Sequence, residues 1–328
     1  MTIEPQPPMQ SPDVDSERIS SVVQPLAQML REIINMSPAS IPDPHSDAQR
    51  PDPRVNEIIL QRLREWHIKI DGENTTYKKS LGAGYSIATT AFHHVPADIQ
   101  AEIALYTFLV VAIDDGIVDE AALRQFVPRF CSGSPQLHPV LDRLVESCHG
   151  ITSLFAEFGA NIIYTNTMDF VNAELYLMDD RNTLPESLSQ DSVTFINHIR
   201  ASTGISLAYA TFIYPKVEFP EAKDYAQAYP DMVAVINLLN DIFSYYKELK
   251  AGESSNLVST LATAKHTTAL EEIRGLVHCV PDALTRVRGL VAKGKARDAW
   301  EKFFTGYIRF HLSATRYRLS EILPELNL

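Results

Sequence analysis

The segment MVAVINLLNDIFSYYKE, residues 232–248, is apolar at nearly every position of its first half. A helix that is apolar on all faces is a buried helix. Three polar side chains, Asn240, Ser244 and Glu248, then follow at four-residue spacing. Successive members of such a series lie on one helix face, about 6 Å apart. The segment therefore predicts a buried helix that presents three oxygen-bearing side chains from one face.

This polar triplet has the chemistry of a site for a hard divalent cation. An amide oxygen, a hydroxyl and a carboxylate suit Mg²⁺, which keeps waters and phosphate oxygens in its remaining positions. Lys247 lies beside Glu248 and adds a cation for a phosphate ligand. The alternative is the polar stripe of an ordinary amphipathic helix. It is disfavoured because the rest of the segment is apolar and aromatic, as at Ile236 and Phe243.

A second apolar run, LVVAI at 109–113, leads directly into DDGIVDE at 114–120. Four carboxylates within seven residues repel one another unless a cation neutralises them, and magnesium prefers such oxygen ligands. On an ideal helix Asp115 and Asp119 share a face, whereas Asp114 points about 100° away. Gly116 loosens the helix here. Taken alone, the run is also compatible with a solvated acidic helix end.

From residue 54 onward the apolar pattern is helical almost throughout. No stretch alternates strictly between apolar and polar residues around hairpin turns, so no sheet is expected. We predict an all-α fold in a single domain over 54–328, with its helices around a deep apolar cavity. The expected helices span 54–66, 97–115, 120–130, 137–157, 159–178, 191–213, 220–250, 266–278, 282–293 and 295–322.

Residues 1–53 contain ten of the 20 prolines. Proline fixes φ and removes a backbone donor, so this density predicts a loosely held N-terminal extension. One helix is expected inside it, with Pro25 in the first turn. The apolar residues Leu26, Met29, Leu30, Ile33 and Ile34 follow at helical spacing.

Composition excludes several classes of protein. The net charge is −12, and the sequence shows no basic cluster of the kind that marks a nucleic-acid-binding protein. No apolar run reaches the ~18 residues of a membrane span, and the acidic, Pro-rich N-terminus resembles neither a signal nor a transit peptide. The three widely spaced cysteines form no CxxC pair and fit a reducing cytosol, so a cytoplasmic location is expected. His93 and His94 belong to no HExxH zinc motif.

Two basic clusters are candidates for binding phosphate. In RASTG (200–204), a mid-helix glycine costs about 1 kcal/mol relative to alanine, so Gly204 suggests a break that exposes a carbonyl. Arg200, one turn earlier, can fork onto phosphate oxygens. Near the C-terminus, Arg316, Tyr317 and Arg318 offer two guanidinium groups and a phenol. Each cluster alone is equally compatible with ordinary surface residues.

Together these motifs resemble class I terpene cyclases. NDIFSYYKE fits their Asn/Ser/Glu pattern, and DDGIVD looks like their aspartate-rich motif lengthened by one residue. HLSATRYRLSEI (311–322) and the region from RASTG through FIYP (200–215) are similar to segments of the fungal trichodiene synthase-like family. The resemblance covers roughly residues 75–325.

The resemblance implies a class I terpenoid synthase fold and a sesquiterpene cyclase. Such an enzyme ionises farnesyl diphosphate, releases diphosphate and cyclises the carbocation to a hydrocarbon or an alcohol. It also implies three Mg²⁺ ions, for which Mn²⁺ can substitute, and leaves a homodimer open. The two alternatives are a chain-elongating prenyl diphosphate synthase, which would need a second aspartate-rich motif, and a non-catalytic helical scaffold that only binds cations.

Site roles follow from the same resemblance. Asp114 would bridge two magnesium ions, although ideal helix geometry favours Asp115 and Asp119. Asp115 would be held by an arginine, and metal binding by Asp119 stays open. The residues Asn240, Ser244 and Glu248 would hold the third ion.

The resemblance also implies residues that bind the diphosphate group and residues that stabilise the carbocation. Arg200 would sense the diphosphate, with Thr203 as linker and the Gly204 carbonyl as effector. Lys247, Arg316 and Tyr317 would bind diphosphate oxygens. Aromatic faces stabilise cations by about 0.5–2 kcal/mol each, and the candidates for this role are Tyr106, Phe108, Phe155, Tyr209, Phe212 and Phe243.

Overall fold

The computed structural model describes residues 12–38, 51–70, 75–180 and 188–326, and in these ranges it contains helices and no strand. The predicted all-α fold is therefore confirmed. The helices are α1 (Pro12–Ile34), α2 (Pro53–Glu65), α3 (Thr75–Thr90), α4 (Ala97–Asp114), α5 (Glu120–Ser132), α6 (Pro139–Thr152), α7 (Glu157–Asp180), α9 (Val193–Thr203), α10 (Ser206–Phe212), α11 (Tyr229–Ala251), α12 (Leu257–Lys265), α13 (Ala269–Leu290) and α14 (Lys295–Ser313). Short 3₁₀ turns, Thr315–Tyr317, Leu319–Glu321 and Pro324–Leu326, follow α14.

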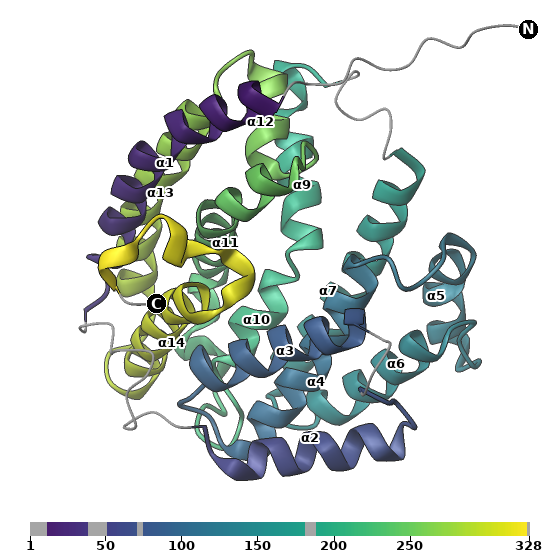
Figure 1. The fold of residues 1–328 in the computed structure, drawn as a ribbon. Coiled ribbons are helices and arrows are strands. Elements are labelled where there is room, and N and C mark those ends of the chain that lie inside the picture. Colours follow the sequence, from purple (N-terminus) through teal and green to yellow (C-terminus); the bar gives the residue numbers. More distant parts are fainter. Residues whose placement is uncertain (1–11, 39–50, 71–74, 181–187, 327–328) are drawn as a thin grey trace, which may run out of the picture.

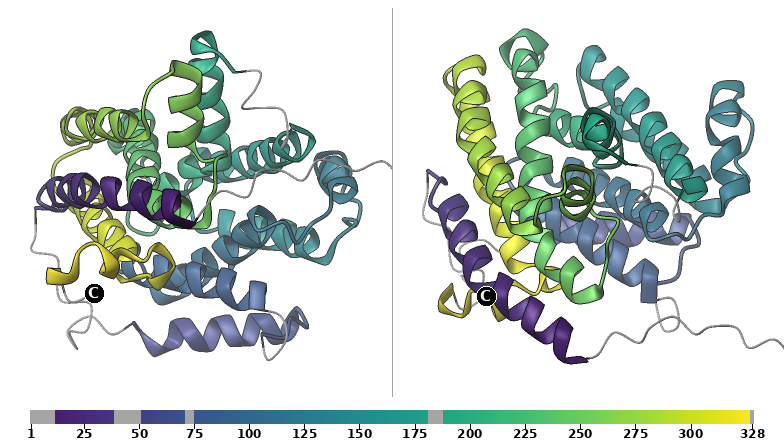
Figure 2. Two further views of the ribbon diagram at one scale, coloured as in Figure 1. Left: turned by 45° about the horizontal axis from the view of Figure 1, so that its top comes forward. Right: turned by 90° about the horizontal axis from the view of Figure 1, so that it is seen from above.

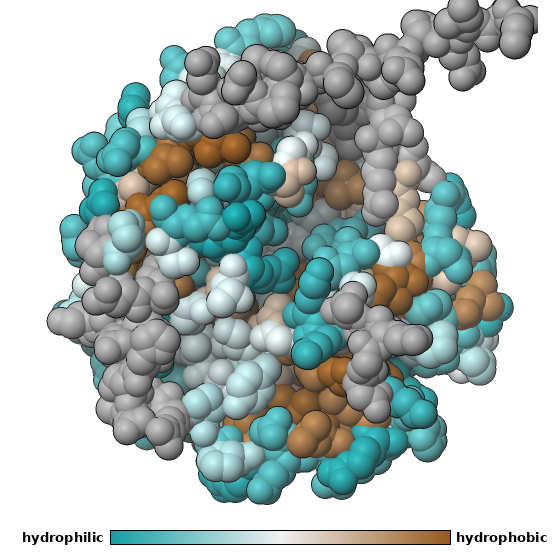
Figure 3. All heavy atoms as spheres, viewed as in Figure 1, coloured by the Kyte–Doolittle hydropathy of each residue, from teal (hydrophilic) through white to brown (hydrophobic). Residues whose placement is uncertain are grey.

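Helices from both halves of the chain enclose a common interior (Figure 1). The helix α4 is buried along almost its whole length, and α11 is buried through most of its second half, as their apolar sequences predict. The helix α2 covers one end of the molecule, and apolar side chains gather toward that end on the face seen in Figure 3. Within the described residues, no helix is long and apolar enough to cross a membrane.

Two helices were not predicted, and α3 shows why. Its sequence, TTYKKSLGAGYSIATT, has small residues in place of an apolar stripe. A Cβ atom on Gly84 would collide with the carbonyl oxygen of Ala104 on α4. The missing side chain therefore permits close backbone packing of α3 on α4, and periodicity cannot reveal such a contact. The other missed helix is α12.

Several predicted boundaries are wrong. The segments 266–278 and 282–293 form one helix, α13, with Pro281 inside it. The predicted helix 295–322 stops at Ser313, and 220–250 begins only at Tyr229 after two short 3₁₀ turns. The predicted helix 191–213 divides into α9 and α10 at Gly204 and Ile205.

The N-terminal helix is longer and better packed than predicted. Leu26, Leu30 and Ile33 are fully buried in the main core, and α1 packs against α13 (Figures 1 and 2). Pro25 lies inside α1 rather than in its first turn. A loosely held extension is therefore wrong for this helix, while 1–11 and 39–50 lie outside the described residues.

Candidate active site

A cavity of about 770 Å³ opens between the helices and collects most of the predicted site residues. Its walls come from α3, α4, α7 and from the C-terminal half of the chain, α9 to α12, α14 and the 3₁₀ turn after it. The predicted residues that line it are Asp114, Asp115, Arg200, Thr203, Gly204, Tyr209, Asn240, Ser244, Lys247, Glu248, Arg316 and Tyr317.

The aspartate-rich segment begins at the C-terminal end of α4. Asp114 is the last residue of α4 and Asp115 is its C-cap. Gly116 follows in the left-handed region with φ 78°, so ideal helix geometry ends here. Asp119 does not line the cavity, because it is the N-cap of α5, where its Oδ1 accepts from the Ala122 amide at 2.8 Å. Asp119 is thus engaged as a helix cap in this structure, and its role as a metal ligand stays a prediction.

Asp115 is held by a serine and not by the expected arginine. The Ser80 hydroxyl on α3 lies 3.1 Å from Asp115 Oδ2 and 2.9 Å from the carbonyl oxygen of Thr76, so its one hydrogen is shared between two acceptors. No ion pair joins Asp115 to a basic residue in the described part of the chain. Ser80 is fully buried. No sequence pattern indicates this contact, because α3, the helix that carries Ser80, has no apolar stripe from which it could be predicted.

The pKa values of two carboxyl groups at the cavity are raised above their ordinary values. Asp114 is accessible from the cavity, yet the surrounding protein and then the charge of Asp115 raise its pKa, against the opposing effect of nearby basic groups. Burial also raises the pKa of Glu248, which the hydrogen bond from Ser244 and the charge of Lys247 only partly offset. A cation bound between these groups would favour their charged forms, so the donor set fits one.

The candidate metal site is not a cluster of the usual ligand side chains. Within the residues that the structure describes, no group of three or more His, Cys, Asp and Glu side chains is arranged to hold a metal ion. The candidate ligand set instead depends on the amide of Asn240 and the hydroxyl of Ser244. These are oxygen donors of the kind that Mg²⁺ accepts alongside water and phosphate.

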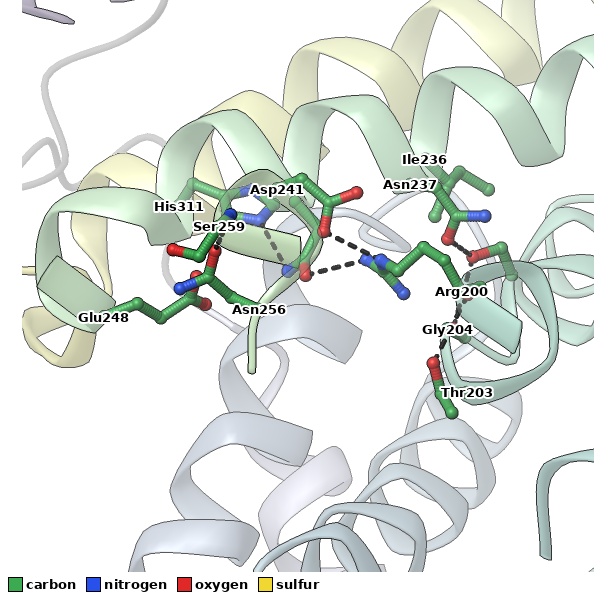
Figure 4. Close-up of polar contacts among 12 residues, drawn as sticks. Arg200, Thr203, Gly204, Ile236, Asn237, Asp241, Glu248, Asn256, Ser259 and His311 are labelled. Atoms are coloured by element: carbon green, nitrogen blue, oxygen red, sulfur yellow. Dashed lines mark hydrogen bonds and ion pairs between the residues drawn. The ribbon is translucent and has the colours of Figure 1, made fainter. Parts of the chain in front are cut away.

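Arg200 joins α9 to α11 through two hydrogen bonds. Its Nε donates to Asp241 Oδ1 at 2.7 Å, and its Nη2 donates to Asn240 Oδ1 at 3.1 Å. Figure 4 shows the guanidinium group extending from α9 toward Asp241. Asp241 lines the cavity and is 7% exposed, and it is not among the residues predicted from the motifs. Its signal was present, as an extra carboxylate directly after Asn240 in NDIFSYYKE.

The predicted helix break is present, but its special backbone geometry lies one residue later than expected. Gly204 has a right-handed φ of −70°, and Ile205 takes the left-handed φ of 45°. Position 204 is nevertheless crowded: a Cβ atom there would lie within 3.0 Å of the side chains of Asn237, Arg200 and Ser206, so these side chains would have to shift. The Ser206 hydroxyl contacts both Asn237 Oδ1 and the Gly204 carbonyl, the latter at 3.2 Å.

The C-terminal cluster reaches the cavity on the first 3₁₀ turn after α14. The Arg316 guanidinium lies 5.7 Å from the ring centroid of Tyr317. Burial raises the pKa of Tyr317 to about 12, so its phenol keeps its proton as a donor. The next turn is tethered to α11, because Glu321 accepts from Tyr246 at 2.9 Å and lies 3.5 Å from Lys250 Nζ.

The aromatic predictions were mostly wrong about the cavity surface. Tyr209 lines the cavity, and its hydroxyl donates to Thr107 at 3.1 Å. Phe108, Phe212 and Phe243 are fully buried in the core and are not among the lining residues. Tyr106 and Phe155 are not among them either. The aromatic residues that line the cavity beside Tyr209 are Phe170, Phe195, Tyr307, Phe310 and Tyr317.

The all-helical fold is the class I terpenoid synthase fold. Its interior cavity brings together paired aspartates, a polar helix stripe and three basic residues. Linalool/nerolidol synthase from Streptomyces clavuligerus matches 83% of this chain and 98% of its own, with a TM-score of 0.60 and 12% identity.

Sequence comparisons then give the family. The profile described as Trichodiene synthase (TRI5) matches residues 76–327. Two relatives from Postia placenta, monoterpene synthase 25 and terpene synthase 29, are 30% and 31% identical. Each alignment covers 83% of this chain, and 80% and 78% of the respective relative. The chain belongs to the trichodiene synthase family and is a terpene synthase, which confirms the resemblance seen in its motifs.

Proposed function

We propose that this terpene synthase is a sesquiterpene cyclase that ionises farnesyl diphosphate with the help of Mg²⁺. The observation that carries the proposal is the lining of one cavity. Acidic and polar oxygen donors lie together with Arg200, Lys247 and Arg316, while the remaining walls are largely apolar and aromatic. Such a cavity offers a charged region for the diphosphate and an apolar region for the hydrocarbon chain.

The residues that would hold three Mg²⁺ ions are Asp114 on α4 and the Asn240, Ser244 and Glu248 face of α11. Mn²⁺ is expected to substitute, since it takes similar oxygen ligands. Bound there, such ions would supply Lewis-acid stabilisation of the diphosphate leaving group. Asp115 lies beside Asp114, and the hydrogen bond from Ser80 limits how freely it turns.

Different residues of the chain would then bind the diphosphate and stabilise the carbocation. Arg200, Lys247, Arg316 and Tyr317 are donors suited to diphosphate oxygens. The Gly204 carbonyl lies at the break between α9 and α10, where its dipole would face a nascent allylic cation, with Thr203 as the link to Arg200. The apolar walls exclude water and shape the carbocation. Tyr209 and the other lining aromatics would stabilise it through their ring faces.

The length of the prenyl chain is the open choice within this proposal. A cavity of about 770 Å³ falls within the ~300–1,000 Å³ range of ligand sites and is large enough for the fifteen-carbon farnesyl chain. One relative is named a monoterpene synthase, so geranyl diphosphate is the competing substrate. A chain-elongating synthase is disfavoured because the Asn/Ser/Glu triplet stands where a second aspartate-rich motif would be required.

The test is incubation of the purified chain with farnesyl or geranyl diphosphate, with and without Mg²⁺, followed by gas chromatography. We expect a cyclic sesquiterpene hydrocarbon or alcohol from farnesyl diphosphate, and no product after chelation of the metal. Better turnover of geranyl diphosphate, or products longer than the substrate, would contradict the proposal. A scaffold that only binds cations would be stabilised against heat by Mg²⁺ alone, whereas a cyclase needs Mg²⁺ and diphosphate together. The homodimer stays a prediction, which sedimentation of the chain tests.

A further inference from the structure

His311, near the end of α14, is an unusual neighbour of the candidate metal ligands. Its side chain is completely buried, and it is not among the residues that line the cavity. Four aromatic rings surround the imidazole, those of Phe243, Tyr307, Phe310 and Tyr317, with centroids 4.6–5.1 Å from its own. The ring is therefore fixed in position, and only its two nitrogens offer polar contacts.

The hydrogen bonds of His311 define which nitrogen carries the proton. Its Nδ1 lies 2.8 Å from the carbonyl oxygen of Tyr307, and a carbonyl only accepts, so Nδ1 carries the hydrogen. The other nitrogen, Nε2, is then an acceptor. It lies 3.3 Å from Nδ2 of Asn240, whose amide group donates to it.

This contact determines how the Asn240 carboxamide is turned. With its NH₂ group directed to His311, the amide presents Oδ1 on the opposite side, where Arg200 Nη2 donates to it at 3.1 Å. A carboxamide turned by 180° has nearly the same shape but would present NH₂ toward the cavity. An amide oxygen binds a cation and an amide NH₂ repels it, so the orientation decides whether Asn240 is a ligand.

We propose that His311 is a positioning residue that holds the Asn240 carboxamide with its oxygen toward the cavity. This inference rests on the proposed function, in which that oxygen binds Mg²⁺. Arg200 also favours the same orientation, but its guanidinium is the group that would turn to the diphosphate. The Tyr317 hydroxyl interacts with Asn240 as well. His311 is the contact that persists while the ligand-facing groups change partners, and partners of this kind are worth roughly 10- to 100-fold in metal affinity.

Three substitutions of His311 distinguish the contributions of its two ring nitrogens. His311→Phe keeps a ring in the aromatic enclosure and removes both hydrogen bonds. His311→Asn keeps a polar group near Nδ1 and leaves nothing at Nε2, whereas His311→Gln places an acceptor near Nε2. His94→Phe is the control, since His94 is largely buried, contacts a backbone carbonyl of Ile213 at 3.4 Å and does not line the cavity.

The measurement is calorimetric binding of inorganic diphosphate as a function of Mg²⁺ concentration, which needs no turnover. We expect diphosphate binding by His311→Phe and His311→Asn to require at least about 10-fold more Mg²⁺ than binding by the parent. His311→Gln should recover part of that loss, and His94→Phe should match the parent. Unchanged Mg²⁺ dependence in His311→Phe, or equal dependence in the Asn and Gln variants if the Phe variant fails to fold, would overturn the proposal. A parent protein that binds no diphosphate with Mg²⁺ would instead refute the proposed function, and the inference with it.

Discussion

Arg200 on α9 and Asp241 on α11 form an ion pair, with Nε and Oδ1 2.7 Å apart and with both side chains largely withdrawn from solvent. The same guanidinium donates to Asn240, the first member of the Asn/Ser/Glu triplet. A proposed diphosphate sensor is therefore already in contact with a proposed metal ligand. Metal binding and diphosphate binding are expected to influence each other through this arginine.

The first prediction concerns the shape of that guanidinium group. In Arg200→Lys the charge remains, but a single ammonium cannot reproduce the forked contacts to Asp241 and Asn240. We expect the single-turnover rate of ionisation to fall by about 10- to 100-fold, since a charged hydrogen bond is worth about 1.5–3 kcal/mol. Binding of Mg²⁺ and inorganic diphosphate should weaken less than the rate falls.

The chain provides a matched control for this substitution. Arg286 pairs with Asp231 through the same two atom types at 2.8 Å, and neither residue lines the cavity. Arg286→Lys should therefore leave the rate unchanged. An ionisation rate that is equally unaffected in Arg200→Lys would reject the sensor role.

The second prediction concerns the triplet itself. Asn240→Ala and Glu248→Ala remove oxygen donors at the cavity, and neither side chain lies in the hydrophobic core. Mutation of a residue that only orients a metal ligand reduces metal affinity or activity by about 10- to 100-fold. Loss of a direct ligand should therefore reduce turnover by more than about 100-fold. Circular dichroism should stay unchanged. Steady-state turnover at limiting Mg²⁺ provides the measurement, with Glu221→Ala, exposed at 62% and remote from the cavity, as control.

Part of this architecture was accessible from the sequence, and the division has a physical basis. The apolar helices α4 and α11 and the polar triplet are local patterns, so periodicity reveals them. The contacts of Arg200 with Asp241 and of Asn240 with His311 join residues 41 and 71 positions apart. No single-sequence pattern encodes such pairs. The helix α3 and the role of Ser80 were missed for the related reason that backbone contact at Gly84 leaves no apolar stripe.

The third prediction tests the close packing at the helix break. In Gly204→Ala the new Cβ would meet Asn237 and Arg200, so we expect a loss of about 1–3 kcal/mol in the free energy of unfolding, typical of overpacking. Activity should fall as well, because Arg200 must move. Removing the obstructing side chain in the double variant Gly204→Ala/Asn237→Ala should restore part of the stability.

A second glycine gives the opposite expectation. Gly275 lies inside α13, and a Cβ there would meet nothing within 4 Å. Gly275→Ala should therefore stabilise the protein by up to about 1 kcal/mol, through the lower entropy of the unfolded chain. Urea denaturation of both alanine variants checks the pair. Equal effects of the two substitutions would argue against a steric requirement at Gly204.

The fourth prediction concerns the N-terminal helix α1, which was expected to be loosely held and instead packs on the core. Deleting residues 1–50 would remove α1 and expose the apolar surfaces of α11 and α13 that it covers. We expect such a truncation to be poorly soluble or strongly destabilised. In the full chain, Leu30→Ala should cost about 2–5 kcal/mol in denaturant unfolding. Leu60→Ala, at a residue 46% exposed, should stay within about 0.5 kcal/mol. A soluble, fully stable truncation would contradict the packing of α1.

The fifth prediction is a pH dependence of stability that arises from His94. Burial lowers the pKa of His94 to about 3, from an ordinary value of 6.5; the His93 and Lys302 charges act in the same direction, and the hydrogen bond to the Ile213 carbonyl opposes them. Below pH 6.5 the unfolded chain binds a proton here that the folded chain does not. The contribution of His94 is thus fully present above pH 6.5 and is lost as the pH falls toward 3, by at most about 1.4 kcal/mol per pH unit.

Carboxyl groups with raised pKa values, such as those of Glu102 and Asp114, change stability in the opposite direction over part of this range. The test therefore compares variants and not absolute stabilities. His94→Gln cannot bind the proton, so its free energy of unfolding should fall less steeply than that of the parent between pH 7 and pH 5 in urea titrations. His278→Gln, at an exposed position on α13, should follow the parent curve. Parallel curves for parent and His94→Gln would show that the imidazole takes up its proton in the folded protein as readily as in the unfolded chain.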